Sequence, residues 1–182
     1  KCSVSMWTAY KLACEGTGLL WMGDFQNARH LLQALTRRLD KKGVPAKRGA
    51  DTPDQGAHSA GQAFHRHRQN QAHRARILGM LLIPFNADHC IPLRRAPDVR
   101  QACSEAYGAA TEAYVTSLRE LLGLIGAHEW RKKGVAIEAL KGHGSGRIHA
   151  HYGVFSPVRG EYVDLVKQAP LPAGTGHAVD VG

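Results

Sequence analysis

Several features that mark large classes of proteins are missing from the 182-residue sequence. Its longest apolar stretch, residues 77–85, contains a glycine and a proline and is much shorter than the roughly 20 residues that cross a bilayer, so no membrane association is expected. The N-terminal residues do not form the hydrophobic segment of a signal peptide, and we therefore expect a cytoplasmic protein. The cysteines show neither the CxxC spacing of a zinc ribbon nor a disulfide framework, which predicts that they are buried and reduced (Cys2, Cys14, Cys90 and Cys103).

Acidic residues are absent from one long basic stretch. Residues 55–87 contain four arginines and four histidines but no Asp or Glu. Residues 1–100 carry 16 Lys and Arg against 7 Asp and Glu, whereas residues 101–182 carry 8 of each. This asymmetry predicts an N-terminal half that faces a polyanion, although a solvated helix face also produces a basic run of this length. The arginines are Arg66, Arg68, Arg74 and Arg76, and the histidines are His58, His65, His67 and His73.

These four arginines are the candidate substrate-binding residues. Together with later arginines they can bind RNA phosphates and position a target nucleotide. They can equally contact acidic patches of a protein substrate or of another domain. The three tryptophans are mostly not interleaved with the arginines, so a platform for stacking bases is not predicted. The later arginines are Arg94, Arg95 and Arg100, and the tryptophans are Trp7, Trp21 and Trp130.

Hydrophobic spacing predicts a mainly helical domain over residues 1–126. Its first helix is expected over residues 6–14. Asp24 can cap a second helix over residues 25–39, because the apolar residues of that segment fall on one face. Residues 41–61 are rich in Gly, Pro, Ala and charge and have no periodicity, which predicts a mobile loop.

Two longer helices are predicted after this loop. Ser59 can cap a helix that runs to Leu82, starts in solvent, ends in the core and is terminated by Pro84. Asp98 can cap a further helix that carries apolar residues at helical spacing as far as Ile125. A glycine at position 108 is expected to break or kink this last helix.

The pattern changes over residues 127–182. Residues 147–154 alternate in polarity with a period of two, which predicts a strand. A short helix is expected over residues 157–168, and a final strand over residues 178–181. The order of elements predicts a mainly α N-terminal domain followed by the first elements of an α/β, Rossmann-like domain.

The final strand carries the sharpest local motif. Val179-Asp180-Val181-Gly182 is an apolar strand that ends in an acidic residue and a glycine, which is typical of the start of nucleotide-binding α/β domains. Together with the preceding segment Tyr152–Val166, which includes the letters GVFSP, it resembles class I S-adenosylmethionine-dependent methyltransferases. The likeness is to the branch with a small substrate-binding domain ahead of the catalytic domain. That branch includes the release-factor glutamine methyltransferases and the guanine N2-methyltransferases of ribosomal RNA.

The resemblance implies S-adenosylmethionine as cofactor and a set of cofactor-binding residues. Asp180 and Gly182 would begin the glycine-rich cofactor loop. The loop and helix start that close over the methionine end of the cofactor would contain Phe155, Ser156, Pro157 and Arg159. The later glycines, the acidic residue for the ribose and the catalytic motif of the family would follow Gly182, so the sequence is expected to be an inactive fragment of a longer enzyme.

Two functions from different classes follow. The first is the N-terminal part of a methyltransferase that acts on RNA or on a protein of the translation apparatus, as the resemblance implies. The second is a stand-alone basic helical module that binds nucleic acid, which the charge asymmetry predicts on its own. A purely structural or protein-interaction domain is the third interpretation.

Histidines near the predicted strand of residues 147–154 also suggest a metal site. His149 and His151 would share one face of that strand, with His143 nearby. No neighbouring cysteine completes a zinc ligand set, so polar or substrate-facing roles are favoured and no metal is expected. A basic segment with an aromatic residue, Trp130–Gly134, is interpreted as a surface turn, and no spacing locates a Cys–His nucleophile pair.

Overall fold

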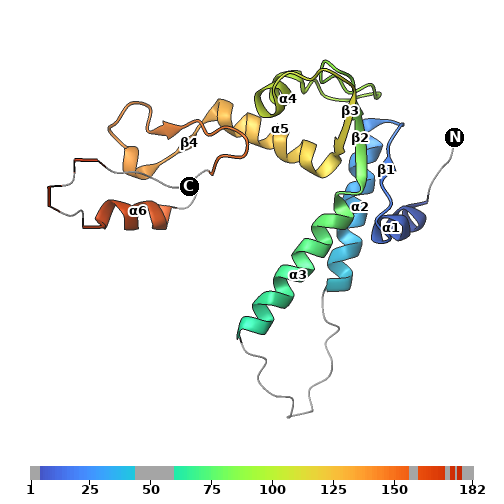
Figure 1. Ribbon diagram of the computed structural model, residues 1–182, viewed down its shortest axis with the longest axis horizontal. Coiled ribbons are helices and arrows are strands. Elements are labelled where there is room, and N and C mark those ends of the chain that lie inside the picture. Colours follow the sequence, from blue (N-terminus) through green and yellow to red (C-terminus); the bar gives the residue numbers. More distant parts are fainter. Residues whose placement is uncertain (1–4, 44–59, 156–159, 171–172, 175, 178–182) are drawn as a thin grey trace, which may run out of the picture. The chain divides into compact units, whose positions relative to one another are not determined.

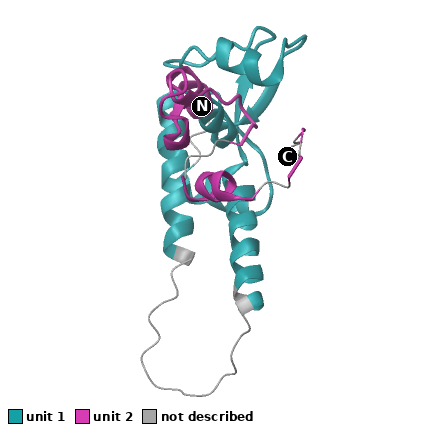
Figure 2. Ribbon diagram, turned by 90° about the vertical axis from the view of Figure 1, so that its left-hand side faces the viewer, with its two compact units in different colours: residues 1–125 teal, residues 126–182 magenta. Residues whose placement is uncertain are grey.

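The computed structural model describes residues 5–43, 60–155, 160–170, 173–174 and 176–177 (Figure 1). The chain forms two compact units, Lys1–Ile125 and Gly126–Gly182 (Figure 2). The described residues form an α-rich fold with a few short strands.

The first unit begins with helix α1 (Met6–Cys14), strand β1 (Leu19–Leu20) and helix α2 (Phe25–Gly43). The Ser5 hydroxyl caps α1 by accepting a hydrogen bond from the backbone N–H of Thr8 at 3.2 Å. Asp24 caps α2 as predicted, since its Oδ1 accepts from the backbone N–H of Gln26 at 2.9 Å. The prediction for α1 is confirmed at both ends, whereas α2 continues past residue 39 to Gly43.

The second half of the next apolar run, residues 77–85, is a strand and not the end of a helix. Helix α3 spans Ala60–Leu78, and strand β2 spans Leu81–Phe85. The predicted continuation of α3 to Leu82 is therefore wrong. The run has alternating burial, and β2 gains backbone partners on both sides, because it pairs with β1 in parallel and with β3 (Tyr114–Ser117) in antiparallel register. Ser59, the predicted cap of α3, lies outside the described residues.

The predicted helix from Asp98 to Ile125 is also wrong as a single element. It is divided into helix α4 (Arg100–Tyr107), strand β3 and helix α5 (Leu118–Lys133). Gly108 ends α4 with a φ of +78°, a conformation that favours glycine, which confirms the predicted break. The Asp98 carboxylate accepts a hydrogen bond from the backbone N–H of Arg100 at 3.2 Å, so it does stabilise the start of α4.

The core of the first unit is formed by α1, α2, the end of α3, β2, α4 and the beginning of α5. Cys103 is fully buried in this core, in agreement with the expectation for the cysteines. Cys90 differs because it lies exposed in the turn after β2, where its carbonyl accepts from the N–H of Asn86 at 2.9 Å. The largest fully buried side chains are Phe25, Phe85, Leu35, Ile77, Leu81, Ile83, Leu118, Leu121 and Leu124.

The second unit contains short elements. Strands β4 (Val135–Ala136) and β5 (Arg147–Ile148) pair antiparallel, a 3-10 helix η1 spans Glu138–Leu140, and helix α6 spans Gly160–Gln168. The predicted strand of residues 147–154 is correct only for its first two residues. The chain turns afterwards, with the N–H of Val154 bonded to the carbonyl of His151 at 3.1 Å.

Other predicted elements fall partly or wholly on residues that are not described. These are the strand of residues 178–181, the start of the helix predicted from residue 157, and residues 44–59 of the predicted loop. Residues 41–43 of that loop belong to α2, and residues 60–61 belong to α3. The described part of the predicted helix near the C-terminus is α6.

The C-terminal end of α5 is closed by a glycine and by two side chains. Gly134 has a φ of +73°, and its N–H donates to the carbonyl of Trp130 at 2.8 Å. A guanidinium N–H of Arg147 donates to the carbonyl of Gly134 at 2.9 Å, and the Nδ1–H of His149 donates to the carbonyl of Arg131 at 2.7 Å. These donors satisfy carbonyls that the last turn of a helix leaves without partners.

Replacing Gly134 with alanine is expected to destabilise the second unit by about 2 kcal/mol, because strain and a steric clash coincide there. A Cβ at this position would lie 2.8 Å from the ring of His149 and 3.2 Å from the Cβ of Arg147. Gly142 is the matched control, because it has a φ of +89° but a Cβ added there would meet no atom within 4 Å. Chemical denaturation of both alanine variants should show the larger loss at Gly134, and equal losses would contradict the role of the clash.

Candidate nucleic-acid interface

Helices α2 and α3 form the most basic part of the first unit. They contact each other and form the two arms of a hairpin in Figure 1. One face of α2 is buried through Phe25, Ala28, Leu32 and Leu35, as its hydrophobic spacing predicts. The two helices hold nine Lys and Arg but a single acidic residue, Asp40. Such a surface has a positive potential that attracts polyanions.

The first two thirds of α3 are exposed around the whole helix. Every side chain whose burial is described in residues 61–73 is exposed, including Phe64 with 58% of its surface accessible. The helix joins the core only at its end, where Ile77 and Leu78 are buried. A helical segment that is exposed on all sides gains little stability from burial. Its side chains are therefore available for contacts with a partner.

The four predicted arginines of α3 have different surroundings. Arg66, Arg68 and Arg76 are exposed, whereas Arg74 is half-buried and forms an ion pair with Asp40 of α2. Arg66 and Arg68 lie on opposite sides of the helix, because residues two apart on an α-helix diverge. The Arg68 guanidinium lies 5.8 Å from the ring centroid of Phe64. The arginines therefore surround the helix and do not form one row.

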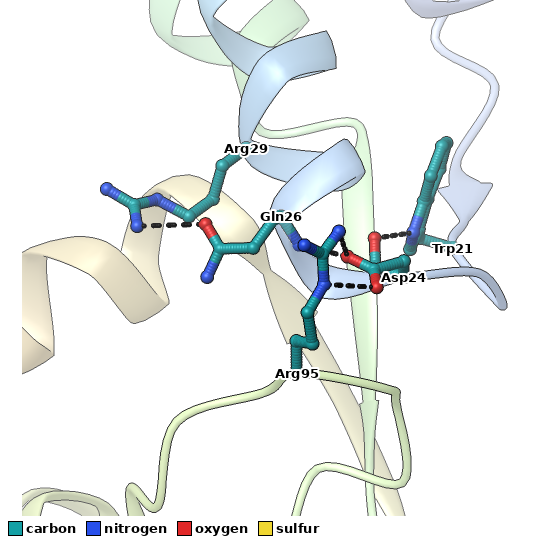
Figure 3. A network of polar contacts seen from close by, with 5 residues as sticks. All are labelled: Trp21, Asp24, Gln26, Arg29 and Arg95. Atoms are coloured by element: carbon teal, nitrogen blue, oxygen red, sulfur yellow. Dashed lines mark hydrogen bonds and ion pairs between the residues drawn. The ribbon is translucent and has the colours of Figure 1, made fainter.

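Arg95 and Arg100 are each engaged in an ion pair with a carboxylate of the first unit. Arg95 binds both carboxylate oxygens of Asp24, at 2.6 and 2.8 Å (Figure 3). The indole N–H of Trp21 donates to the carbonyl of Asp24 at 2.9 Å. Asp24 therefore connects the residue after β1, the start of α2 and the loop before α4. Arg100 binds the carboxylate of Asp98 in the same two-point manner, which holds the pKa of Asp98 at about 2.

The Asp24–Arg95 pair predicts a specific pH dependence. Hydrogen bonds from Arg95 lower the pKa of Asp24 below its ordinary value near 3.9, so the pair stabilises the fold above that pH and loses its effect as the pH falls through the lowered pKa. Asp24→Asn should therefore lower the thermal unfolding midpoint at pH 6, with the difference from the native chain shrinking below pH ~4. Glu129→Gln, which removes an exposed pair with Lys132, is the control and should change the midpoint little. A constant deficit of the Asn variant across the pH series would contradict the ionic role.

The residues implied as a cofactor site are mostly outside the described ranges. Phe155 is described; it has 75% of its surface accessible and lies 5.7 Å, centroid to centroid, from the ring of Tyr162 in α6. Ser156, Pro157, Arg159, Asp180 and Gly182 are not described. A cavity of about 470 Å³ in the second unit is lined by the loop between η1 and β5 and by α6.

The histidines considered as metal ligands have structural surroundings where they are described. His149 caps α5 through its bond to Arg131, and the loop after β5 takes His151 out of a strand. Within the described residues, no three His, Cys, Asp or Glu side chains are grouped as a metal site requires. Trp130, in the predicted basic surface turn, lies in the last turn of α5 and is exposed.

Sequence reasoning missed a buried polar cluster around His89. Only 5% of the surface of His89 is accessible, and its φ is +62°. Its Nε2 lies 2.8 Å from the carbonyl oxygen of Gly108, which can only accept, so Nε2 carries a hydrogen. Nδ1 lies 2.8 Å from the hydroxyl of Tyr114, which donates to it when the ring is neutral.

The same cluster continues to Cys103 and to a small cavity. The ring of Tyr114 stacks on Phe85 with 4.7 Å between centroids, and Cys103 is buried in the same core. Burial raises the pKa of both Tyr114 and Cys103, so both remain protonated at neutral pH. The cavity, about 310 Å³, is also lined by Tyr107, whose hydroxyl donates to Glu120 at 2.8 Å.

Comparisons with family models, with curated proteins and with solved structures gave no match for this chain. Within the described ranges, none of the helices is both long and apolar enough to cross a membrane. The function is therefore inferred from the geometry of the basic hairpin and from the sequence resemblance.

Proposed function

We propose that the first unit binds RNA through α3 and that it is the substrate-recognition part of an S-adenosylmethionine-dependent methyltransferase. The observation that supports RNA binding best is the exposure of the first two thirds of α3 on all sides, together with the lack of any acidic residue in this helix. Arg66, Arg68 and Arg76 are exposed for contacts with phosphates, because only Arg74 of the four is engaged with a carboxylate of α2. Contacts of this kind position a nucleic acid without reading its sequence.

RNA binding is tested by fluorescence anisotropy of a labelled RNA over a series of salt concentrations. The proposal predicts measurable affinity at about 50 mM salt and a linear fall of log affinity with log salt, as counterion release requires. Absence of binding at that salt concentration would remove the proposal. Binding with a flat salt dependence would contradict the role of the arginines.

The methyltransferase part of the proposal is supported by the resemblance of Tyr152–Val166 and of residues 178–182. It is tested by isothermal titration of S-adenosylmethionine into the protein and two variants. Asp180→Ala should weaken cofactor binding, whereas Arg66→Ala should leave it unchanged and weaken RNA binding instead. Equal losses of cofactor affinity would contradict this division. The alternative function is a stand-alone module that binds nucleic acid. In that case RNA binds, but titration of S-adenosylmethionine gives no heat of binding.

A further inference from the structure

An exposed tryptophan lies against an arginine of the basic hairpin. Trp7 of α1 has 56% of its surface accessible. The Cζ of Arg38, from α2, lies 4.3 Å from the centroid of the Trp7 ring and 4.8 Å from that of Tyr10. The guanidinium therefore covers part of the indole and anchors it against α2 by cation–π contact. The Arg38 Nε is buried and has no hydrogen-bond partner in the part of the chain that the structure describes.

The surroundings of Trp7 are cationic. Lys11 is exposed one turn farther along α1, and Lys41 is exposed one turn beyond Arg38 on α2. Helix α1 contacts both α2 and α3, so the fold places an aromatic side chain next to the basic hairpin. The sequence did not predict the position of Trp7 beside the basic hairpin, because Trp7 and Arg38 are separated along the chain by the whole of β1 and most of α2.

We propose that Trp7 is a stacking platform for an unpaired base of an RNA whose phosphates contact the basic hairpin. This inference rests on the proposed RNA binding and adds that the substrate is single-stranded where it meets α1. An exposed indole offers a flat surface that any base can stack on, and cations beside it bind the flanking phosphates. In an RNA duplex the base faces are covered by neighbouring bases, so a duplex can use the cations but not Trp7.

The experiment compares a single-stranded RNA of about twelve nucleotides with a duplex of the same sequence, using the full chain. Trp7→Ala should weaken binding of the single strand about ten-fold and change binding of the duplex less than about two-fold. Trp7→Phe should recover most of the loss because it keeps a stacking face. Trp130→Ala is the matched control, since Trp130 has a similar accessible fraction of 59% but lies on α5, and it should bind like the native chain. Thermal melts followed by circular dichroism establish that each variant is folded.

The salt series separates this inference from the proposed function. Trp7→Ala should leave the slope of log affinity against log salt unchanged, because stacking releases no counterions, whereas Arg66→Ala with Arg68→Ala should reduce it. If RNA binds and the arginines matter but Trp7→Ala has no effect, or has the same effect on duplex and single strand, the stacking platform is wrong and RNA binding stands. If no RNA binds at low salt, both are wrong. If polyglutamate displaces the single strand as well as unlabelled RNA does, the surface is a general anion-binding site and the proposed stacking platform is wrong.

Discussion

The double variant Arg66→Ala, Arg68→Ala is expected to bind RNA on the order of ten-fold more weakly than the native chain at about 50 mM salt. Both side chains are exposed on the part of α3 that lies outside the core, so their removal should have little effect on folding. The slope of log affinity against log salt should become shallower by about 0.7 for each phosphate of a single strand that the variant no longer neutralises. Anisotropy titrations over a series of salt concentrations measure both quantities.

Arg74→Ala is the matched control for this prediction. It removes the same kind of side chain from the same helix, but Arg74 is already paired with Asp40. The control variant should lose much less affinity than the double variant, because the Arg74 guanidinium is already held by the Asp40 carboxylate and so is not the group that binds a phosphate. A loss at Arg74 as large as the loss at Arg66 and Arg68 would show that the net charge of the hairpin, and not its exposed arginines, determines binding.

Replacing His89 with alanine is expected to lower the free energy of unfolding of the first unit by about 3 kcal/mol. The change removes the partner of the Tyr114 hydroxyl and the donor to the Gly108 carbonyl, and it leaves a cavity in place of a side chain that is only 5% accessible in the native fold. Urea denaturation followed by tryptophan fluorescence and circular dichroism measures the loss. A destabilisation below about 1 kcal/mol would contradict the structural importance of the cluster.

Two further variants locate the origin of that loss. Tyr114→Phe removes only the hydroxyl and should cost about 1–2 kcal/mol, and combining it with His89→Ala should cost less than the sum of the two because they share a hydrogen bond. His30→Ala, at an exposed histidine of α2, should change stability by less than about 0.5 kcal/mol. Strictly additive losses at positions 89 and 114 would show that their hydrogen bond contributes nothing to the fold.

The sequence predicted those helices whose caps and hydrophobic spacing are local. Asp24 lies just before the amphipathic segment that becomes α2, and residues 6–14 form a helix with the expected bounds. The start of α4 beside Asp98 and its end at Gly108 depend on equally local chemistry. In each case the capping group and the backbone that it stabilises are within a few residues of each other.

The errors come from segments whose structure depends on distant partners. The run at residues 77–85 is apolar throughout, and periodicity alone does not separate a short buried strand from the end of a buried helix. Its first two residues end α3, whereas pairing with β1 and β3 makes residues 81–85 a strand. The spacing from Asp98 to Ile125 likewise suits a helix, but residues 114–117 pair with β2 instead. Tertiary hydrogen bonds outweighed helix propensity in both places.

The candidate sites show the same difference between features that local sequence reveals and features that depend on distant residues. Arginines concentrated in one acid-free stretch are visible in the sequence, and the structure adds that Arg74 is engaged with Asp40. Trp7 contacts Arg38, and His89 contacts Tyr114. In both pairs the two residues are far apart in the chain, so no pattern of sequence spacing predicts the contact. The one local signal was a histidine in the turn Asn86–Cys90, directly after a buried strand, where side chains commonly reach a functional or structural polar cluster.

Photocrosslinking of RNA to the full chain, with the crosslinked peptides identified by mass spectrometry, tests the central claim most directly. The account predicts crosslinks in residues 60–73 of α3 and at Trp7 of α1, where exposed arginines and an exposed indole are available. Crosslinks confined to the second unit, for example at Trp130 and the lysines that follow it, would contradict the account and assign RNA contact to the other part of the chain.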